Sequence, residues 1–460
     1  MVSKKKLLKI EKLKRKARDL SIKESIYAWG RDSFGDKFVA PFAIAINSTN
    51  SMVALLSAVT GLLGPLFQLF GSRLPEQYPR KKIILKTVFY ESLMWLPFIA
   101  IAILFYFNII PEMLPYLLLF SFSLVTIFLH LGHPAWFSWM GDIINEKDRG
   151  RWFAKRSLIG GFVSIILTIL ASVFLDYFKT KGWIMFGFMT LFFLAFIARY
   201  SCYKIYKIQY EPKIKLKEGY YFSFWSFVIN APQTNFGKFT IFRTFFSFAN
   251  SISASLLAIY LLRNLQFSYT IYMAITLSLT LFSLFVLGLW GKFADLYGNY
   301  RVLCITTIFI PTIPILYILS PSPIYLILIP SLIGGISWAG FDLVARNFVY
   351  DNVRRENRGL IVSYYNLLIG IGTFLGAGLG AFLIKFLTVS FIEPIVLIFI
   401  LDSLLRMAVV FYWVPKIKEV KETKKLSRRK IKNLLFKQTK PILMEEVQQI
   451  MSIKEYMEKK

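Results

Sequence analysis

The chain has 460 residues, of which 56% are hydrophobic and 45 are phenylalanine, and its mean hydropathy is +0.55. An ordinary soluble protein is less apolar than this, so the composition argues against a soluble enzyme and favours an integral membrane protein. The formal net charge of +29 would suit a nucleic-acid-binding protein, but the basic residues lie in the two terminal segments and in short clusters between apolar runs. These lysines lack interleaved aromatic side chains for base stacking, and cationic flanks beside membrane spans attract anionic lipid headgroups. We therefore expect membrane lipids, and not nucleic acid, as partners of the basic clusters.

Residues 1–23 form a basic segment with ten Lys or Arg and only two acidic residues. The segment is charged throughout and has no short apolar core, so it is not a cleavable signal peptide. Leucines recur among its lysines, which is the pattern of a helix that lies on the inner surface of a membrane. We predict a cytoplasmic N-terminal segment of this kind.

A helix that crosses the hydrocarbon of a bilayer needs about 20 mostly apolar residues. In the first half of the chain such runs lie near 24–46, 51–71, 83–107, 113–140, 157–176 and 183–203. In the second half they lie near 237–262, 268–290, 302–320, 324–350, 359–384 and 391–414. The sequence therefore predicts an all-α polytopic membrane protein with twelve transmembrane helices. The first run is the weakest, because it contains Arg31, Asp32, Asp36 and Lys37.

The charges of the connecting loops support this count. With the N-terminus in the cytoplasm, the inner loops carry basic clusters such as Arg80-Lys81-Lys82, whereas the outer connections near 47–50 and 108–115 carry no Lys or Arg. Removal of one span would reverse the alternation downstream, so the number of spans is even and both termini are cytoplasmic. The polar, basic stretch 204–236 is the predicted cytoplasmic linker between six-helix bundles at 24–203 and 237–414. Residues 415–460 are a predicted basic cytoplasmic tail.

The two halves repeat a loop pattern. Asp142 is followed by Arg149-Gly150, and Asp351 is followed by Arg358-Gly359 at the same spacing. A parallel repeat of two six-span halves is an architecture of secondary transporters, in which the substrate site lies between the halves near the midplane. The repeat predicts this architecture here.

Two other loops resemble a signature of the major facilitator superfamily, Gly-x-Leu-Ala-Asp-Arg-x-Gly-Arg-Lys. Residues 291–301 read Gly-Lys-Phe-Ala-Asp-Leu-Tyr-Gly-Asn-Tyr-Arg and match it well. Residues 72–82 read Ser-Arg-Leu-Pro-Glu-Gln-Tyr-Pro-Arg-Lys-Lys, with Ser and Pro in place of the glycines and Glu in place of Asp. The loop from Asp142 to Arg151 is also similar to the acidic-then-Arg-Gly-Arg loop between spans four and five of that superfamily.

The resemblance implies a carrier in which two bundles pivot around a central cavity, working as a monomer in the cell membrane. An acidic side chain near a helix end can accept hydrogen bonds from free N–H groups or pair with a nearby Arg, which holds one conformer closed. The residues expected to form such conformational latches are Glu76, Arg80, Asp142, Arg149, Asp295, Arg301, Asp351 and Arg358. The basic members of these loops also fit a simpler role, which is to fix the orientation of the spans.

The first run contains the most conspicuous intramembrane charges. Ionisable side chains are costly at bilayer depth and are retained where they are paired or functional. Asp32 and Asp36 are four residues apart and would share one face of a helix. In a partly dry cavity a carboxylate can take up and release a proton, which makes Asp36 a candidate for proton coupling and Arg31 and Asp32 candidates for its surroundings. The alternative is that Arg31 and Lys37 simply neutralise the two acids at a cytoplasmic entrance.

The resemblance sorts the other intramembrane charges, because spans one, four, seven and ten line the cavity in the superfamily. It favours Arg243 in the seventh run and Asp342 and Arg346 in the tenth as substrate or proton-coupling residues. It places Asp402 and Arg406, in the twelfth run, at the periphery.

Two further candidates lie in the third and fourth runs. Glu91 is an isolated acid in an apolar stretch and remains a candidate. His130 and His133 are three residues apart, so both imidazoles can lie on one helix face. No third or fourth ligand is evident, so we expect neither a metal nor any other cofactor. His133 is a candidate for a polar cavity lining, and a hydrogen-bonded structural role for the pair is the alternative.

The sequence contains no phosphate-cradling loop, nucleophile elbow or metal-ligand cluster, so we do not expect an enzyme. The predicted function is secondary transport of a small organic solute by alternating access, driven by a proton or solute gradient. The alternative is a non-transporting membrane protein of the same fold, which handles lipid or acts as a sensor that recruits a partner. The imperfect first copy of the loop signature keeps this alternative open.

Overall fold

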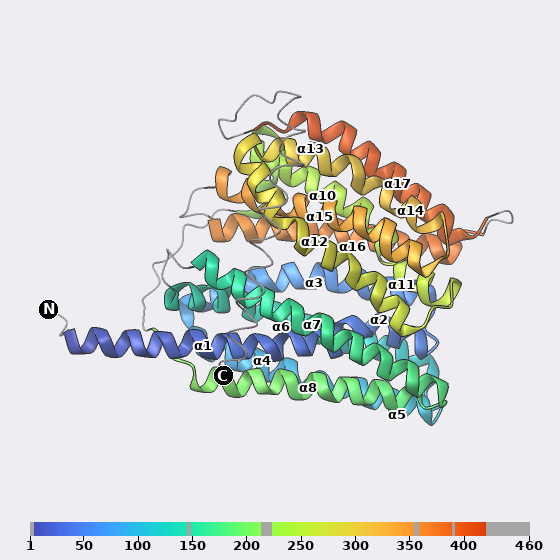
Figure 1. The fold of residues 1–460 in the computed structure, drawn as a ribbon, viewed down its shortest axis with the longest axis horizontal. Coiled ribbons are helices and arrows are strands. Elements are labelled where there is room, and N and C mark those ends of the chain that lie inside the picture. The colour runs from blue at the N-terminus through green and yellow to red at the C-terminus, as the bar shows by residue number, and fades with distance from the viewer. Residues whose placement is uncertain (1–3, 145–148, 213–222, 354–357, 389–391, 420–460) are drawn as a thin grey trace. The chain divides into compact units, whose positions relative to one another are not determined.

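The structure is a computed structural model that describes residues 4–144, 149–212, 223–353, 358–388 and 392–419 (Figure 1). Within these residues the chain is helical and contains no β-strand. The prediction of an all-α protein is confirmed. Long apolar segments favour this outcome because a helix satisfies its own backbone N–H and C=O groups where water is absent.

The helices of the first half follow the six predicted runs, with two of the runs divided in the middle. Their bounds are α1 Lys4–Phe34, α2 Asp36–Ala45, α3 Asn50–Gln77, α4 Arg80–Leu93, α5 Leu96–Tyr106, α6 Leu114–Ile143, α7 Arg149–Thr180 and α8 Ile184–Ile208. The first run is divided at Gly35 between α1 and α2. The third run is divided at Met94 and Trp95, and Pro97 occupies the first turn of α5, where its missing N–H costs nothing.

The helices of the second half are more often interrupted. Their bounds are α9 Phe224–Asn230, α10 Asn235–Ala254, α11 Leu257–Ile259, α12 Tyr269–Tyr297, α13 Asn299–Phe309, α14 Ile313–Ile318, α15 Pro323–Asn352, α16 Arg358–Phe386 and α17 Pro394–Trp413. The seventh run ends in a π-helical turn, Tyr260–Asn264. The ninth run is divided by the 3-10 turn Ile310–Thr312, which contains Pro311. Proline lacks the backbone donor that an uninterrupted α-helix requires.

Eleven of the described helical segments are long and apolar enough to cross a membrane. They correspond to the second through the twelfth predicted runs. The first run does not meet this criterion because α1 and α2 carry the four charges noted above. Helix α1 nevertheless packs against the apolar helices α7 and α8. Together the eleven segments and this charged one are consistent with twelve spans.

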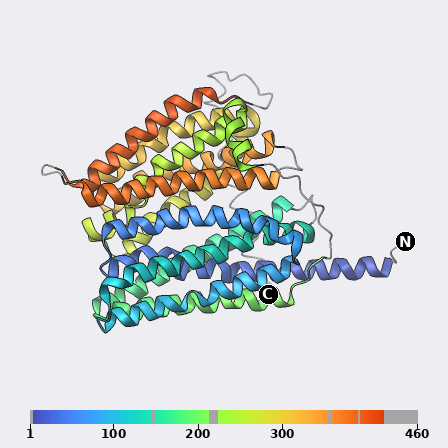
Figure 2. The ribbon, with the colours of Figure 1, turned by 180° about the vertical axis from the view of Figure 1, so that it is seen from behind.

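The N-terminal segment differs from the expected surface helix. Helix α1 begins at Lys4 and continues without interruption to Phe34, so the basic residues 4–23 extend the first span along its own axis (Figures 1 and 2). The physical reason is that no Gly or Pro occurs between Lys4 and Trp29, and Lys, Leu and Arg are good helix formers. Ala17, Ser21, Glu24 and Ser25 are buried, so this extension is already anchored before the predicted boundary at residue 24.

The described residues group into two compact units. Within the described residues, the first unit draws on 4–227, 243–274 and 359–399, and the second on 228–242, 275–358 and 400–419. This grouping brings parts of the second half of the chain together with the first half. The predicted division at the linker 204–236 therefore stays a prediction.

Hydrogen bonds inside the first unit explain its composition. Arg263, in the π-helical turn, donates to Asn50 Oδ1 at 2.5 Å and to the Ser48 carbonyl. Ser51 Oγ donates to the Ala381 carbonyl at 2.9 Å. The Asp176 carboxylate, near the end of α7, accepts from the backbone N–H groups of Tyr269 and Thr270 at 2.8 Å each. The last contact places a negative charge at the start of α12, where free N–H groups point outward.

Glycines bring α16 and α10 into close contact within the same unit. A Cβ atom at Gly380 would lie 2.5 Å from the Ile252 carbonyl oxygen, and a Cβ at Gly372 or Gly376 would overlap the backbone of α10. These three glycines are spaced four apart, the small-residue spacing that lets membrane helices approach closely. The spacing in the sequence predicts this packing, and the structure places it against α10.

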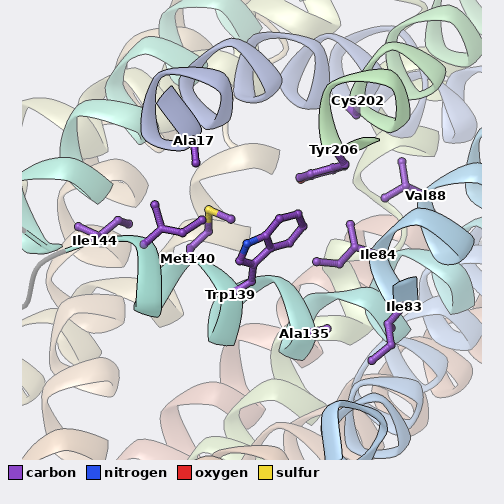
Figure 3. Close-up of a cluster of buried hydrophobic side chains, with 11 residues drawn as sticks. Ala17, Ile83, Ile84, Val88, Ala135, Trp139, Met140, Ile144, Cys202 and Tyr206 are labelled. Carbon is purple, nitrogen blue, oxygen red and sulfur yellow. The ribbon is translucent and has the colours of Figure 1, made fainter. Parts of the chain in front are cut away.

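One cluster of buried apolar side chains joins α1, α4, α6 and α8 (Figure 3). Trp139 of α6 lies at its centre between Ile84, Met140 and Tyr206. The Trp139 indole donates to the Tyr210 carbonyl at 3.0 Å, so its polar atom is satisfied. The cluster holds one end of the four helices together and fixes the walls of the cavity described next.

Candidate functional site

The first unit contains a cavity of about 380 Å³ between α1, α2, α4, α6, α7 and α8. Its aromatic wall is formed by Trp29, Trp136, Phe137, His133 and Tyr206. Its polar lining is formed by Glu24, Arg31, Asp32, Asp36, Thr87, Arg156 and Arg199. The volume is near the lower end of the range for small-molecule sites, about 300–1,000 Å³. Charged groups and aromatic rings therefore meet in one cavity inside the N-terminal bundle.

A break in the first span positions two of these residues. Helix α1 ends at Phe34 and α2 begins at Asp36, because Gly35 leaves the helical conformation with φ of −104° and ψ of −87°. A Cβ atom at Gly35 would lie 2.5 Å from the Trp95 ring, so only glycine fits beneath this indole. The break turns Asp36 towards Arg31, and the two side chains form an ion pair.

The break also corrects the expected geometry of the two acids. Asp32 and Asp36 do not share one face of a continuous helix, and each pairs with a different cation. Asp32 lies 3.6 Å from Lys37 Nζ, and Lys37 also donates to Ser164 Oγ at 2.6 Å and Thr168 Oγ1 at 3.2 Å on α7. Both acids are thus neutralised locally by Arg31 and Lys37, as the alternative interpretation of the sequence expected.

Glu91 lies at the centre of a buried ion-pair network. Its side chain is fully buried, and its Oε2 accepts from Arg199 Nε at 2.8 Å and from Arg199 Nη2 at 2.5 Å. Its Oε1 lies 3.4 Å from Arg31 Nε. Because Arg31 also pairs with Asp36, the four side chains link α1, α2, α4 and α8. The two carboxylates balance the two guanidinium groups, which a low-dielectric interior requires.

A second ion pair lies elsewhere in the cavity wall. Arg156 Nη2 of α7 donates to Glu24 Oε2 of α1 at 2.8 Å, and the Glu24 side chain is almost fully buried. The Arg156 guanidinium also lies over the Trp136 ring, 4.5 Å from its centroid. On the same side, the Trp29 indole lies directly over Gly160, where a methyl group would overlap the ring. A small residue on α7 therefore makes room for the aromatic wall.

The two histidines lie on one face of α6, as their spacing predicts. Their ring centroids are 5.2 Å apart. His133 lines the cavity, whereas the His130 ring packs where a Cβ of Gly64 on α3 would lie. Among the residues that the structure describes, no group of three or more His, Cys, Asp or Glu side chains is arranged to hold a metal ion.

The remaining predicted intramembrane candidates lie outside this cavity. Arg243 is on α10 in the first unit and does not line it. Asp342 and Arg346 are exposed on α15 in the second unit. Asp402 and Arg406, four residues apart in α17, form an intrahelical ion pair, with Arg406 Nη2 2.5 Å from Asp402 Oδ2.

The predicted latch residues fall into related arrangements in the two halves. Arg80, at the start of α4, pairs with Asp142 at the end of α6 and lies 3.4 Å from Glu211. In the second unit, Asn299 at the start of α13 donates to Asp351 Oδ2 near the end of α15 at 2.8 Å. The same two helix ends are therefore joined in each half, by an ion pair in one and a hydrogen bond in the other.

The other latch residues are placed differently. Glu76 and Asp295 are exposed in the last turns of α3 and α12. Arg301, in the first turn of α13, donates to the carbonyl of Tyr297, the last residue of α12, at 3.2 Å. Helices α7 and α16 begin at Arg149 and Arg358, whose side chains lie outside the described ones.

Replacing Arg80 by Ala should lower the free energy of unfolding by about 1–3 kcal/mol. Arg80 is buried and donates to the Ser138 and Pro212 carbonyls at 3.1 Å each as well as to Asp142, so its loss leaves several acceptors without a donor. Thermal unfolding of the detergent-purified protein measures the effect. The neighbouring exposed Lys82, replaced by Ala, is the control and should leave the midpoint unchanged; equal midpoints for both variants would contradict the role given to Arg80.

Sequence reasoning missed three charged residues of this site: Arg199, Arg156 and Glu24. The signal for Arg199 was present, because it is the single charged residue of the otherwise apolar run 183–203. It belongs to the sixth span, which the family resemblance places at the periphery. Arg156 lies just before the fifth run, where it counts among the basic residues that orient the spans, and Glu24 lies at the start of the first run.

A model of the Major Facilitator Superfamily matches residues 239–449. A comparison with curated protein sequences gave no match.

Solved structures match over most of the chain. Nucleoside transporter NupG is 14% identical with a TM-score of 0.62, covering 88% of this chain and 99% of its own. A bacterial homologue of the iron transporter ferroportin, in an inward-facing state, is 14% identical with a TM-score of 0.64, covering 87% and 98%. An auto-inhibited POT family peptide transporter is 13% identical with a TM-score of 0.64, covering 90% and 99%.

At these identities the structural matches establish the fold. The fold, the apolar helices and the sequence match together define a multi-pass membrane transporter. The second half of the chain, residues 239–449, is similar to the Major Facilitator Superfamily, and the structural matches share the transporter fold over most of the chain.

Proposed function

We propose that this protein is a secondary carrier that moves a small organic solute by alternating access, with the cavity of the first unit as part of the solute path. The observation that carries the proposal is the joining of aromatic rings and a buried ion-pair network in one cavity of about 380 Å³. Apolar walls with a few convergent polar groups are typical of small-molecule sites. The proposal places the carrier in the cell membrane as a monomer with both termini in the cytoplasm.

In this proposal a proton gradient drives transport, and Asp36 exchanges the proton. Asp36 lines the cavity at a helix break and shares Arg31 with Glu91. Protonation of Asp36 would leave Arg31 to Glu91 alone and change the net charge of the network by one. A change of this size in a water-poor site alters how well two conformers are stabilised, which is the requirement for coupling.

Replacing Asp36 by Asn should reduce uptake driven by a pH gradient at least tenfold, because the amide cannot exchange a proton. The purified protein would be reconstituted in liposomes and screened with radiolabelled solutes under an imposed gradient. Asp19→Asn, the same substitution at an exposed position on the preceding helix α1, is the control. Asp342→Asn tests the candidate on α15 in the same assay.

The outcomes separate the parts of the proposal. Undiminished gradient-driven uptake in Asp36→Asn would remove the coupling role from this residue. Movement of lipid between leaflets without uptake of any solute would contradict the carrier and favour the lipid-handling alternative. A thermal-shift screen of the same solutes identifies binders independently, because specific binding raises apparent stability.

A further inference from the structure

We propose that the cavity of the first unit recognises an organic cation, namely a solute that presents a protonated amine to Asp32 and Asp36 and an apolar or aromatic body to Trp29, Trp136 and Phe137. The inference rests on the proposed function and adds the chemical class of the solute. It follows from which charges the cavity exposes, which polar atoms already have partners, and what the walls are made of.

The cavity exposes acidic groups more than basic ones. The side chains of Asp36 and Asp32 retain 27% and 30% of their accessible surface. The side chains of Arg31 and Arg199 retain only 7% and 9%, since both are drawn onto Glu91 behind the cavity wall. The Asp32 and Asp36 side chains are therefore more accessible than the Arg31 and Arg199 side chains.

The basic groups in and beside the cavity are already committed as donors. Arg199 directs two N–H groups to Glu91. Arg31 donates to Asp36, and Arg156 donates to Glu24 while its flat face covers Trp136. An anionic solute would have to displace one of these carboxylates and leave it buried without a cation, which is costly.

Three polar atoms of the described lining lack a hydrogen bond. One of them, Arg31 Nε, faces Glu91 Oε1 as an ion pair at 3.4 Å, and the other two are an acceptor and a donor. Asp36 Oδ1 is buried without a hydrogen bond, although Oδ2 of the same carboxylate pairs with Arg31. Trp136 Nε1 is also buried without a hydrogen bond. Buried polar atoms are nearly always satisfied, so each points to a group supplied by a ligand. An ammonium fits Asp36, and a neutral acceptor such as a hydroxyl or carbonyl oxygen fits the Trp136 indole.

The walls suit the rest of such a solute. Trp29 is held in place over Gly160, and Phe137 and Trp136 contact each other with ring centroids 5.0 Å apart. Aromatic faces attract cations and bury apolar groups, so they favour an amine on an apolar body over a strongly hydrated sugar or anion.

Three probes of matched size and different charge test the inference: phenethylammonium, 2-phenylethanol and phenylacetate. Binding to the purified full chain would be measured by calorimetry and by the fluorescence of the cavity tryptophans. We expect phenethylammonium to bind at least tenfold more tightly than either of the other two. Asp36→Asn should lower its affinity at least tenfold and change that of 2-phenylethanol less than twofold, with Asp19→Asn as the unchanged control.

Asp32→Asn provides a second variant should Asp36→Asn fail to fold, because Lys37 keeps its bonds to Ser164 and Thr168. Tighter or equal binding of phenylacetate, no binding of the amine, or amine binding unaffected by both variants would overturn the inference. Uptake of a solute by liposomes without amine binding would leave the carrier intact and reject only the cation class. Amine binding that depends on Asp36, without uptake under any gradient, would support the site and reject transport.

Discussion

Replacing Glu91 by Gln should lower the free energy of unfolding by about 3–5 kcal/mol. Glu91 is fully buried and is the carboxylate that Arg199 and Arg31 share. The amide has nearly the same shape, so the change removes charge without creating a cavity. Two buried guanidinium groups would then face one remaining carboxylate, Asp36, and an uncompensated buried cation is strongly destabilising.

Thermal and denaturant unfolding in detergent would measure this loss. Glu112→Gln, an exposed change in the turn before α6, is the matched control and should have no effect. The double variant Glu91→Leu, Arg199→Leu should regain part of the loss, because it removes one cation together with the anion and replaces both by apolar side chains. A single variant as stable as the starting protein would show that the network contributes no net stability.

Replacing Gly376 by Ala should destabilise the protein by about 1–3 kcal/mol, the usual cost of inserting atoms into a packed interior. A Cβ at this position would overlap the Phe248 carbonyl on α10, and backbone cannot move aside as a flexible side chain can. Helices α16 and α10 would have to separate, with loss of the contacts between them.

Gly378, two residues further along α16, is a close control because a Cβ there meets nothing within 4 Å. Gly378→Ala should leave stability unchanged or raise it by up to about 1 kcal/mol, the difference in helix propensity. Comparison of the two variants by thermal unfolding separates steric overlap from the general effect of glycine in a helix. Equal effects of the two substitutions would contradict the close approach of α10 and α16.

The sequence was sufficient to predict the helices but not the network inside them. Apolar runs and loop charges define where spans lie, because bilayer thickness and backbone satisfaction act on each run separately. The pairing of Glu91 depends instead on how distant helices pack. Arg199, one of its partners, lies 108 residues away in the chain, and no local sequence pattern encodes this pairing. The cost of an ionisable side chain at bilayer depth still identified Glu91 itself as a residue that needs a partner.

The first span shows why a periodicity argument can fail at a functional residue. Spacing alone places Asp32 and Asp36 on one helix face, but Gly35 lies between them and ends α1. Glycine is tolerated inside many helices, so its effect here depends on the Trp95 ring of another helix. Sequence reasoning identified the charges correctly and could not predict the break that orients them.

The length of α1 has a mechanical consequence. Its 31 residues span about 46 Å at the helical rise of about 1.5 Å per residue. One end of this helix carries Arg31 and Asp32 beside the cavity. Because the helix is continuous, a movement of that end also moves the other end. A tilt of about 10° would displace the far end by roughly 8 Å over that length. A fluorescent dye on Lys9 would therefore move by several ångströms when the first span tilts. Energy transfer from this dye to a fixed acceptor would measure that change in distance.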